Sequence, residues 1–114
     1  MNFQEYQARA TESADYPEMK EGGLVYPALG LAGEAGEVAD KIKKIWRNRG
    51  ASSGEDLTPE EYRALSLELG DVLWYCAALA TAMKTSLEAF AEMNLAKLAD
   101  RKARGVIKSE GDNR

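Results

Sequence analysis

One apolar stripe, between positions 59 and 84, limits what this chain can fold into. Its members recur at the i, i+4, i+7 spacing of one helix face, and they are Leu65, Leu69, Val72, Cys76, Leu79 and Met83. Neighbouring apolar residues widen the stripe to more than half of the helix circumference. A small monomer has too little interior to bury such a helix. We therefore expect an all-α protein whose helices pack further in a homo-oligomer.

Start and stop signals divide the chain into four helices and leave no convincing strand. Capping residues begin the helices, namely Asn2 with Glu5, Pro27 in a first turn, Thr58-Pro59-Glu60-Glu61, and Ser86. The expected ends are Ala14, Arg49 before Gly50, Lys84, and Lys102 before Gly105. We predict a four-helix bundle-like single domain over residues 1–105, followed by a polar tail over residues 106–114.

Four carboxylates lie inside the two most apolar helical segments. Glu34 and Glu37 form one i, i+3 pair, and Glu68 and Asp71 form another. On a helix this spacing places both members of a pair on one face, about one turn apart. Like charges at this spacing destabilise a helix by about a few tenths of a kcal/mol, and burying an unpaired carboxylate costs about several kcal/mol. A divalent cation would offset that cost, so the sequence predicts a metal site between two helices, with Glu37 on the more mixed face.

Three glycines precede or interrupt the first carboxylate pair, at positions 30, 33 and 36. Each costs about 1 kcal/mol relative to alanine inside a helix. We expect close helix approach beside the metal site to offset this cost. The alternative is that the second helix begins only after a glycine-rich segment.

The available ligand types narrow the metal. The chain contains no histidine and one cysteine, which excludes the Glu-x-x-His elements of di-iron bundles and the usual ligands of structural zinc. Oxygen ligands alone select Mg²⁺, or Mn²⁺ in its place. Proteins usually hold Mg²⁺ with a few carboxylates together with substrate phosphates. The sequence therefore favours phosphoryl chemistry.

Three motifs of the chain resemble those of a known protein family. GEAGEVAD at residues 33–40 and ELGDVLWY at residues 68–75 are similar to the E-x-x-E and E-x-x-D signature of the MazG-like nucleotide pyrophosphohydrolases. NLAKLADR at residues 94–101 resembles the N-x-x-K-L-x-x-R element of the same all-α NTP pyrophosphatase superfamily. One departure is the spacer between the two acidic motifs, which is long for the signature.

The resemblance implies Mg²⁺-dependent hydrolysis of nucleoside or deoxynucleoside triphosphates to the monophosphate and pyrophosphate, as house-cleaning of the nucleotide pool. Glu34, Glu37, Glu68 and Asp71 would hold the metal and carry out catalysis. Two alternatives stay open. One is phosphoribosyl-ATP pyrophosphohydrolysis. The other is a non-catalytic helical oligomer that binds a nucleotide or a partner and uses its carboxylates in salt bridges.

Five further residues are candidates for substrate binding, namely Lys41, Tyr75, Asn94, Lys97 and Arg101. Lys97 and Arg101 share a helix face with Asn94 and could bind phosphate, although cations near a helix C-terminus are also favoured by the helix dipole. Lys41 lies one turn beyond Glu37 and could contact a phosphate or pair with an acid. Tyr75 could stack on a base or serve core packing.

Composition argues against other classes of partner. A net charge of −4 does not provide the basic face that nucleic-acid polymers require. The N-terminus lacks the features of a secretion signal, and no uninterrupted apolar run reaches the length of a membrane span. The single Cys76 fits a reducing compartment. We expect a cytoplasmic protein.

Overall fold

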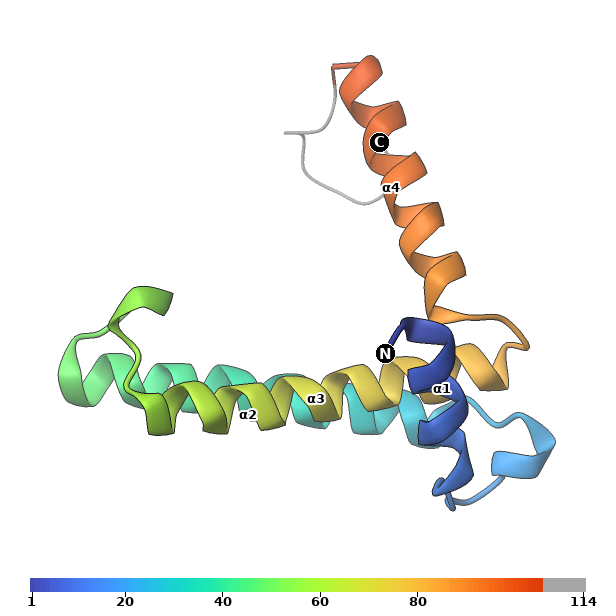
Figure 1. Ribbon diagram of the computed structural model, residues 1–114, viewed down its shortest axis with the longest axis horizontal. Helices are drawn as coiled ribbons and strands as arrows, with labels where there is room; N and C mark the ends of the chain where they lie inside the picture. Colours follow the sequence, from blue (N-terminus) through green and yellow to red (C-terminus); the bar gives the residue numbers. More distant parts are fainter. Residues whose placement is uncertain (106–114) are drawn as a thin grey trace.

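The structure is a computed structural model that describes residues 1–105 of the 114-residue chain. The predicted polar tail, residues 106–114, lies outside the described residues. The described part contains four α-helices and no strand, arranged as in Figure 1. The helices are α1 (Phe3–Glu12), α2 (Val25–Arg49), α3 (Pro59–Ala82) and α4 (Leu87–Ala103), with short 3₁₀ turns η1 (Met19–Glu21) and η2 (Gly54–Asp56). The prediction of an all-α single domain is confirmed.

Three of the four predicted helix starts, those of α1, α3 and α4, are confirmed by capping hydrogen bonds, whereas α2 begins at Val25 without a side-chain cap. The Asn2 side chain accepts from the Glu5 amide at 2.8 Å, and Thr58 and Glu61 form a reciprocal capping box. Ser86 accepts from the backbone amide of residue 89 at 3.1 Å. These bonds satisfy amides that have no partner within the helix.

Two helix ends fall earlier than predicted. α1 ends at Glu12, not Ala14, and α3 ends at Ala82, not Lys84. Lys84 has a φ of 59°, in the left-handed region, so the chain leaves the helix by a tight turn. Apolar periodicity did not reveal this turn because Met83 continues the stripe although it no longer belongs to the helix.

α2 and α3 lie side by side as an antiparallel pair, and α1 crosses the C-terminal half of α3 (Figure 1). The buried core is small, and most of its members are alanines where the helices approach closely. They are Pro27, Ala51, Leu65, Ala77, Ala78, Ala80 and Leu87. Gly50, with a φ of 73°, ends α2 as predicted.

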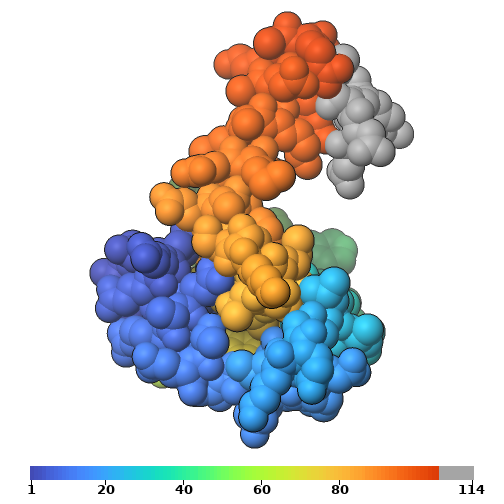
Figure 2. Space-filling view, turned by 90° about the vertical axis from the view of Figure 1, so that its right-hand side faces the viewer, coloured from blue at the N-terminus to red at the C-terminus, as the bar shows by residue number. Residues whose placement is uncertain are grey.

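α4 projects away from the other three helices and contacts mainly α1 and the end of α3 (Figures 1 and 2). Its direction is set at its base by Gln7. The Gln7 Nε2 donates to Thr81 Oγ1 at 3.1 Å and to the Thr85 carbonyl at 3.0 Å, and Gln7 Oε1 accepts from the Leu87 amide at 3.0 Å. One side chain of α1 therefore fixes the turn between α3 and α4.

The chain exposes more surface than a compact monomer of its size. Its accessible surface is 8446 Å², against about 6,200 Å² expected for a folded monomer of this mass. Its radius of gyration is 16.8 Å, against about 13 Å for a compact domain of this length. Large apolar side chains remain exposed on every helix, among them Phe3, Leu29, Trp46, Tyr62, Leu69, Met93 and Leu95.

Within the described residues, α3 also has the length and composition of a helix that crosses a membrane, with a mean hydropathy of 1.2. The core helix of a water-soluble protein meets the same criterion, so one such helix is weak evidence for a membrane. Glu68 and Asp71 lie in the middle of this helix, where charge in a bilayer is costly.

Candidate metal centre

Three of the four predicted carboxylates converge between α2 and α3. Glu34 from α2 and Glu68 and Asp71 from α3 each present an oxygen, and these oxygens all lie within 4.8 Å of one another. We call these residues the carboxylate trio. Glu34 and Glu68 are half-buried and Asp71 is exposed, so the trio is anchored between the helices and open on one side.

The three carboxylates of the trio carry like charges and lie close together. Partial burial, followed by the charges of Asp71 and Glu68, raises the pKa of Glu34 above its usual value. The side chain of Glu68 contributes further by a hydrogen bond to Glu34. An oxygen-only, anionic donor set of this kind fits a divalent metal ion, which would remove the repulsion.

Glu37 lies outside the trio. It is exposed on α2, one turn beyond Glu34, and its charge still contributes to the raised pKa of Glu34. Helical periodicity had placed Glu37 on a face that mixes apolar and polar residues, and its exposure agrees with that prediction.

Lys41 is the cation beside the trio. Its Nζ lies 3.7 Å from Glu68 Oε1, so in this structure it pairs with an acid, one of the two predicted alternatives. The other lysines nearby are occupied differently, since Lys43 and Lys44 both pair with Asp40 at 3.2 and 2.7 Å.

Tyr75 lies one turn after Asp71 and its ring rests directly on Gly30 of α2. A side chain at position 30 would overlap the Tyr75 ring, so close helix approach explains this glycine. Gly33 and Gly36 face open space within the described chain, so close helix approach does not explain these two glycines. All three positions lie within α2, which excludes a helix that begins after them.

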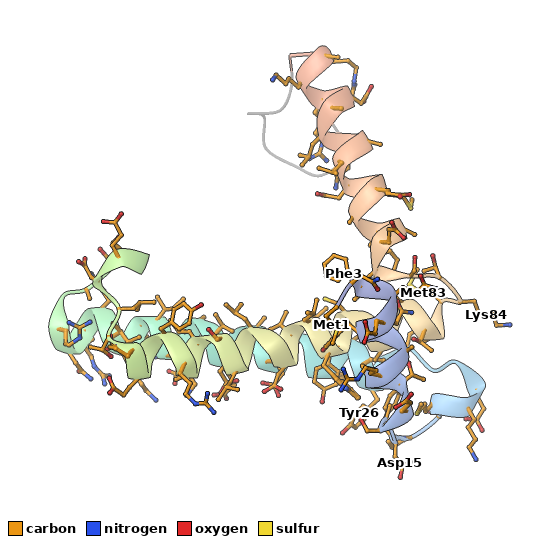
Figure 3. All side chains as sticks on the ribbon, in the orientation of Figure 1. Met1, Phe3, Asp15, Tyr26, Met83 and Lys84 are labelled. Atoms are coloured by element: carbon orange, nitrogen blue, oxygen red, sulfur yellow. The ribbon has the colours of Figure 1, made fainter. Side chains whose placement is uncertain are left out.

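Tyr75 also belongs to a group of aromatic side chains beside the trio. Trp74 meets it edge-on with ring centroids 5.1 Å apart, and Tyr16 stacks on Tyr26 at 5.2 Å. Burial, the nearby Tyr26 and the charges of Glu34 and Asp71 raise the pKa of Tyr75. Figure 3 labels Tyr26 at the end of the helix pair that lies beside α1.

Tyr6 of α1 is a neighbour of the site that the sequence patterns did not single out. Burial and then the charge of Asp71 raise the pKa of its hydroxyl. Its place on the apolar side of α1 was visible in the sequence, but nothing local indicated that α1 crosses α3 near Asp71.

The three α4 candidates are not brought to the trio within one chain. Asn94 and Lys97 are exposed and Arg101 is half-buried on α4, which leads away from α2 and α3 (Figure 1). Helix α4 rises about 1.5 Å per residue, so Lys97 lies about 15 Å along it from buried Leu87.

An all-α fold with a carboxylate trio between two antiparallel helices defines a class of candidate divalent-metal proteins. A family model described as the MazG nucleotide pyrophosphohydrolase domain matches residues 27–106, most of the chain. The chain therefore belongs to the MazG nucleotide pyrophosphohydrolase family. It is also 43% identical over 118 residues to the Gene 37 protein of Mycobacterium phage L5, with both chains covered completely. No solved structure gives a significant match.

Proposed function

We propose that this protein hydrolyses nucleoside or deoxynucleoside triphosphates between the α and β phosphorus atoms, with Mg²⁺ or Mn²⁺, to give the monophosphate and pyrophosphate. The convergence of Glu34, Glu68 and Asp71 within 4.8 Å is the observation that carries the proposal, and membership of the family supports it. A house-cleaning role in the cytoplasm, by a homo-oligomer, completes the proposal.

In the reaction, water adds to a phosphorus atom, the bond to the bridging oxygen breaks, and pyrophosphate or the monophosphate leaves with that oxygen. Glu34, Glu68 and Asp71 would hold the metal, which neutralises charge on the phosphates when bound. Glu34, with its raised pKa, or the exposed Glu37 would accept the proton of the attacking water.

Other side chains have supporting roles. Lys41, 3.7 Å from Glu68, would exchange its carboxylate partner for a phosphate oxygen when substrate binds. Tyr75 would present the edge or face of its ring to the nucleoside, held in place by Gly30 on its other side.

The test is release of pyrophosphate from a panel of NTPs and dNTPs with and without Mg²⁺, and phosphoribosyl-ATP belongs in the same panel. Glu34→Gln and Asp71→Asn should abolish release, while Glu55→Gln, at an exposed position in η2, serves as the matched control. Equal activity in all variants would refute the role of the trio. A non-catalytic binding protein would instead bind a non-hydrolysable nucleotide by calorimetry without any dependence on Mg²⁺.

A further inference from the structure

Lys41 is the basic residue of α2 that faces the carboxylate trio. It follows Glu34 by about two helical turns, so the two side chains leave α2 on nearly the same face. Its Nζ lies 3.7 Å from Glu68 Oε1, whereas the neighbouring lysines of α2 pair with Asp40. Within the described residues, Lys41 is therefore the only ion-pair partner of the trio.

The ion pair between Lys41 and Glu68 is loose. A second ion pair also joins α2 to α3, between Arg49 and Glu61, and its N–O distance of 2.6 Å is that of a charge-assisted hydrogen bond. At 3.7 Å, Lys41 is attracted to Glu68 without a hydrogen bond between them. The ammonium group is therefore held near the trio by charge alone, and another cation at Glu68 would displace it.

Lys41 also has room to move away from Glu68. A groove of about 260 Å³ lies beside Lys41, and its lining includes the apolar side chains of Ile45, Ala64 and Leu65. A lysine packs its aliphatic stem on such a surface while its ammonium group turns to another partner. Glu60 lines the same groove and is exposed. Lys41 can therefore leave Glu68 and keep both its packing and an acidic neighbour.

We propose that Lys41 competes with the divalent metal for Glu68, and that this competition couples metal binding to nucleotide binding. Without nucleotide, the ammonium group of Lys41 stays at Glu68 and lowers the affinity of the trio for metal. A phosphate group of the nucleotide draws Lys41 away from Glu68, so the affinity for metal rises. By linkage, the affinity for nucleotide rises by the same factor when metal is present.

The two parts of the proposal have different foundations. The competition for Glu68 requires only that the trio binds a divalent ion. The coupling rests on the proposed function, because it requires that Lys41 contacts a phosphate group of the nucleotide. The two parts are therefore tested separately.

Calorimetry with Mg²⁺ alone tests the competition without using activity. Lys41→Met keeps an aliphatic stem and removes the charge, so it should tighten Mg²⁺ binding by about two- to fivefold, the range of a partly exposed ion pair. A merely structural role of Lys41 gives the opposite sign, because loss of a contact between α2 and α3 would loosen the trio. Unchanged or weaker Mg²⁺ binding in Lys41→Met overturns the competition.

Lys44→Met is the matched control. Lys44 lines the same groove, but its Nζ lies 2.7 Å from Asp40 and pairs with no member of the trio. The variant removes the same charge from the same helix and should leave the Kd for Mg²⁺ at the wild-type value. Equal tightening in Lys44→Met would mean that only net charge matters, and it also overturns the competition.

The coupling is measured with a nucleotide that has a methylene bridge between the α and β phosphorus atoms and is not hydrolysed there. The ratio of its Kd in EDTA to its Kd in Mg²⁺ gives the coupling factor, since Mg²⁺ binds the free nucleotide equally whichever variant is present. Lys41→Met should lower this ratio by the same factor by which it tightens Mg²⁺ binding. Lys41→Arg keeps a cation and should restore most of the coupling. An unchanged ratio in Lys41→Met overturns the coupling.

Failure of this inference and failure of the proposed function give different results. If Lys41→Met tightens Mg²⁺ binding but wild-type protein releases no pyrophosphate, the proposed function fails and the competition for Glu68 stands. If wild-type protein releases pyrophosphate while Lys41→Met changes neither the Kd for Mg²⁺ nor the ratio, the proposed function stands and the role of Lys41 as a competitor is overturned.

Discussion

Two charged regions join α2 to α3, and they are built in opposite ways. At the corner between the helices, Arg49 donates to both carboxylate oxygens of Glu61, at 2.6 and 3.1 Å, and to the Asp56 carbonyl at 2.8 Å. Further along the pair, the carboxylate trio gathers like charges within 4.8 Å. The pKa of Glu61 is lowered by its hydrogen bonds to Arg49, whereas the pKa of Glu34 is raised by burial and by its acidic neighbours.

The corner around Arg49 and Glu61 contributes to the stability of the fold, whereas the trio has the electrostatics of a binding site. The charged groups of the corner find their partners within this chain. Arg49 pairs with Glu61, and Glu61 also forms the capping box with Thr58. The trio opposes folding because its charges repel one another, and only Glu68 among its members has an ion-pair partner within the described residues, Lys41. Charge that destabilises a protein in this way is typical of sites that bind a ligand.

The largest expected effect is on activity. Asp71→Asn should lower pyrophosphate release by about 10²–10³-fold, the loss typical when a charge that stabilises the transition state is removed. The same variant should melt no lower than wild type without metal, because it relieves repulsion. Arg49→Met should do the reverse, with a lower Tm and nearly full activity below that temperature. Loss of activity through unfolding in Asp71→Asn, seen by circular dichroism, would remove the contrast.

Metal should stabilise the trio and leave the corner unaffected. At a concentration of Mg²⁺ about 100-fold above its Kd, binding should add about 2.7 kcal/mol to the free energy of unfolding. Glu34→Gln should lose this gain, whereas Thr58→Ala, in the corner, should keep it in full. Thermal melts with Mg²⁺ and with EDTA measure the difference, and an equal gain in Glu34→Gln would show that the metal binds elsewhere.

Gly30 tests whether packing holds the trio together. Gly30→Ala places a methyl group against the Tyr75 ring, and overpacking of this kind costs about 1–3 kcal/mol. Gly33→Ala, in open space on the same helix, should instead stabilise the chain by about 1 kcal/mol. Urea unfolding of the two variants gives the comparison. The same sign of change in both would mean that Tyr75 moves aside freely.

Loss of the Thr58 cap should lower the free energy of unfolding by less than overpacking at Gly30 does. Thr58→Ala removes the hydroxyl that accepts from the Glu61 amide at 3.1 Å, and loss of such a cap costs about 1 kcal/mol. Thr58→Ser keeps the acceptor and should restore most of the stability. Chemical denaturation of these two variants and wild type is sufficient to decide.

The smallest effect is that of pH, and its sign should differ between the regions. The ordinary pKa of Glu is 4.5. The folded pKa of Glu61 lies below that value, so its contribution is present above pH 4.5 and is lost as the pH falls through the folded pKa. The folded pKa of Glu34 lies above 4.5, so metal-free protein loses stability as the pH rises from 4.5 through that folded pKa.

Melting curves across this range, in EDTA, with Glu61→Gln and Glu34→Gln as references, separate the two contributions. Glu61→Gln should remove the loss at low pH. Glu34→Gln should remove the loss at higher pH. Identical pH profiles in all three proteins would mean that neither group is perturbed.

The sequence predicted what local rules determine. The caps at Asn2, Thr58 and Ser86 and the one-turn spacing of Glu68 and Asp71 depend only on near neighbours, and the structure bears them out. The pairing of Glu34 with the α3 acids followed from the presence of two such motifs. The direction of α4 could not be predicted, since it depends on hydrogen bonds between Gln7 and residues more than 70 positions away.

The three glycines of α2 show the same limit of prediction from the sequence. Positions 30, 33 and 36 have the same residue in the same helix, yet only Gly30 meets a partner in the described chain. The partner, Tyr75, was known from the sequence, but which glycine faces it depends on the register of α2 against α3. Periodicity within each helix does not fix that register.

The contact between Gly30 and Tyr75 has a consequence for the size of the metal ion that we propose for the trio. Both residues lie one helical turn from the trio, Gly30 before Glu34 and Tyr75 after Asp71. Their contact therefore sets how far apart α2 and α3 stand where the carboxylates meet. Mg²⁺ requires oxygens at about 2.0–2.1 Å and Ca²⁺ at about 2.3–2.6 Å. A larger residue at position 30 would widen the spacing and shift the preference from the smaller ion toward the larger.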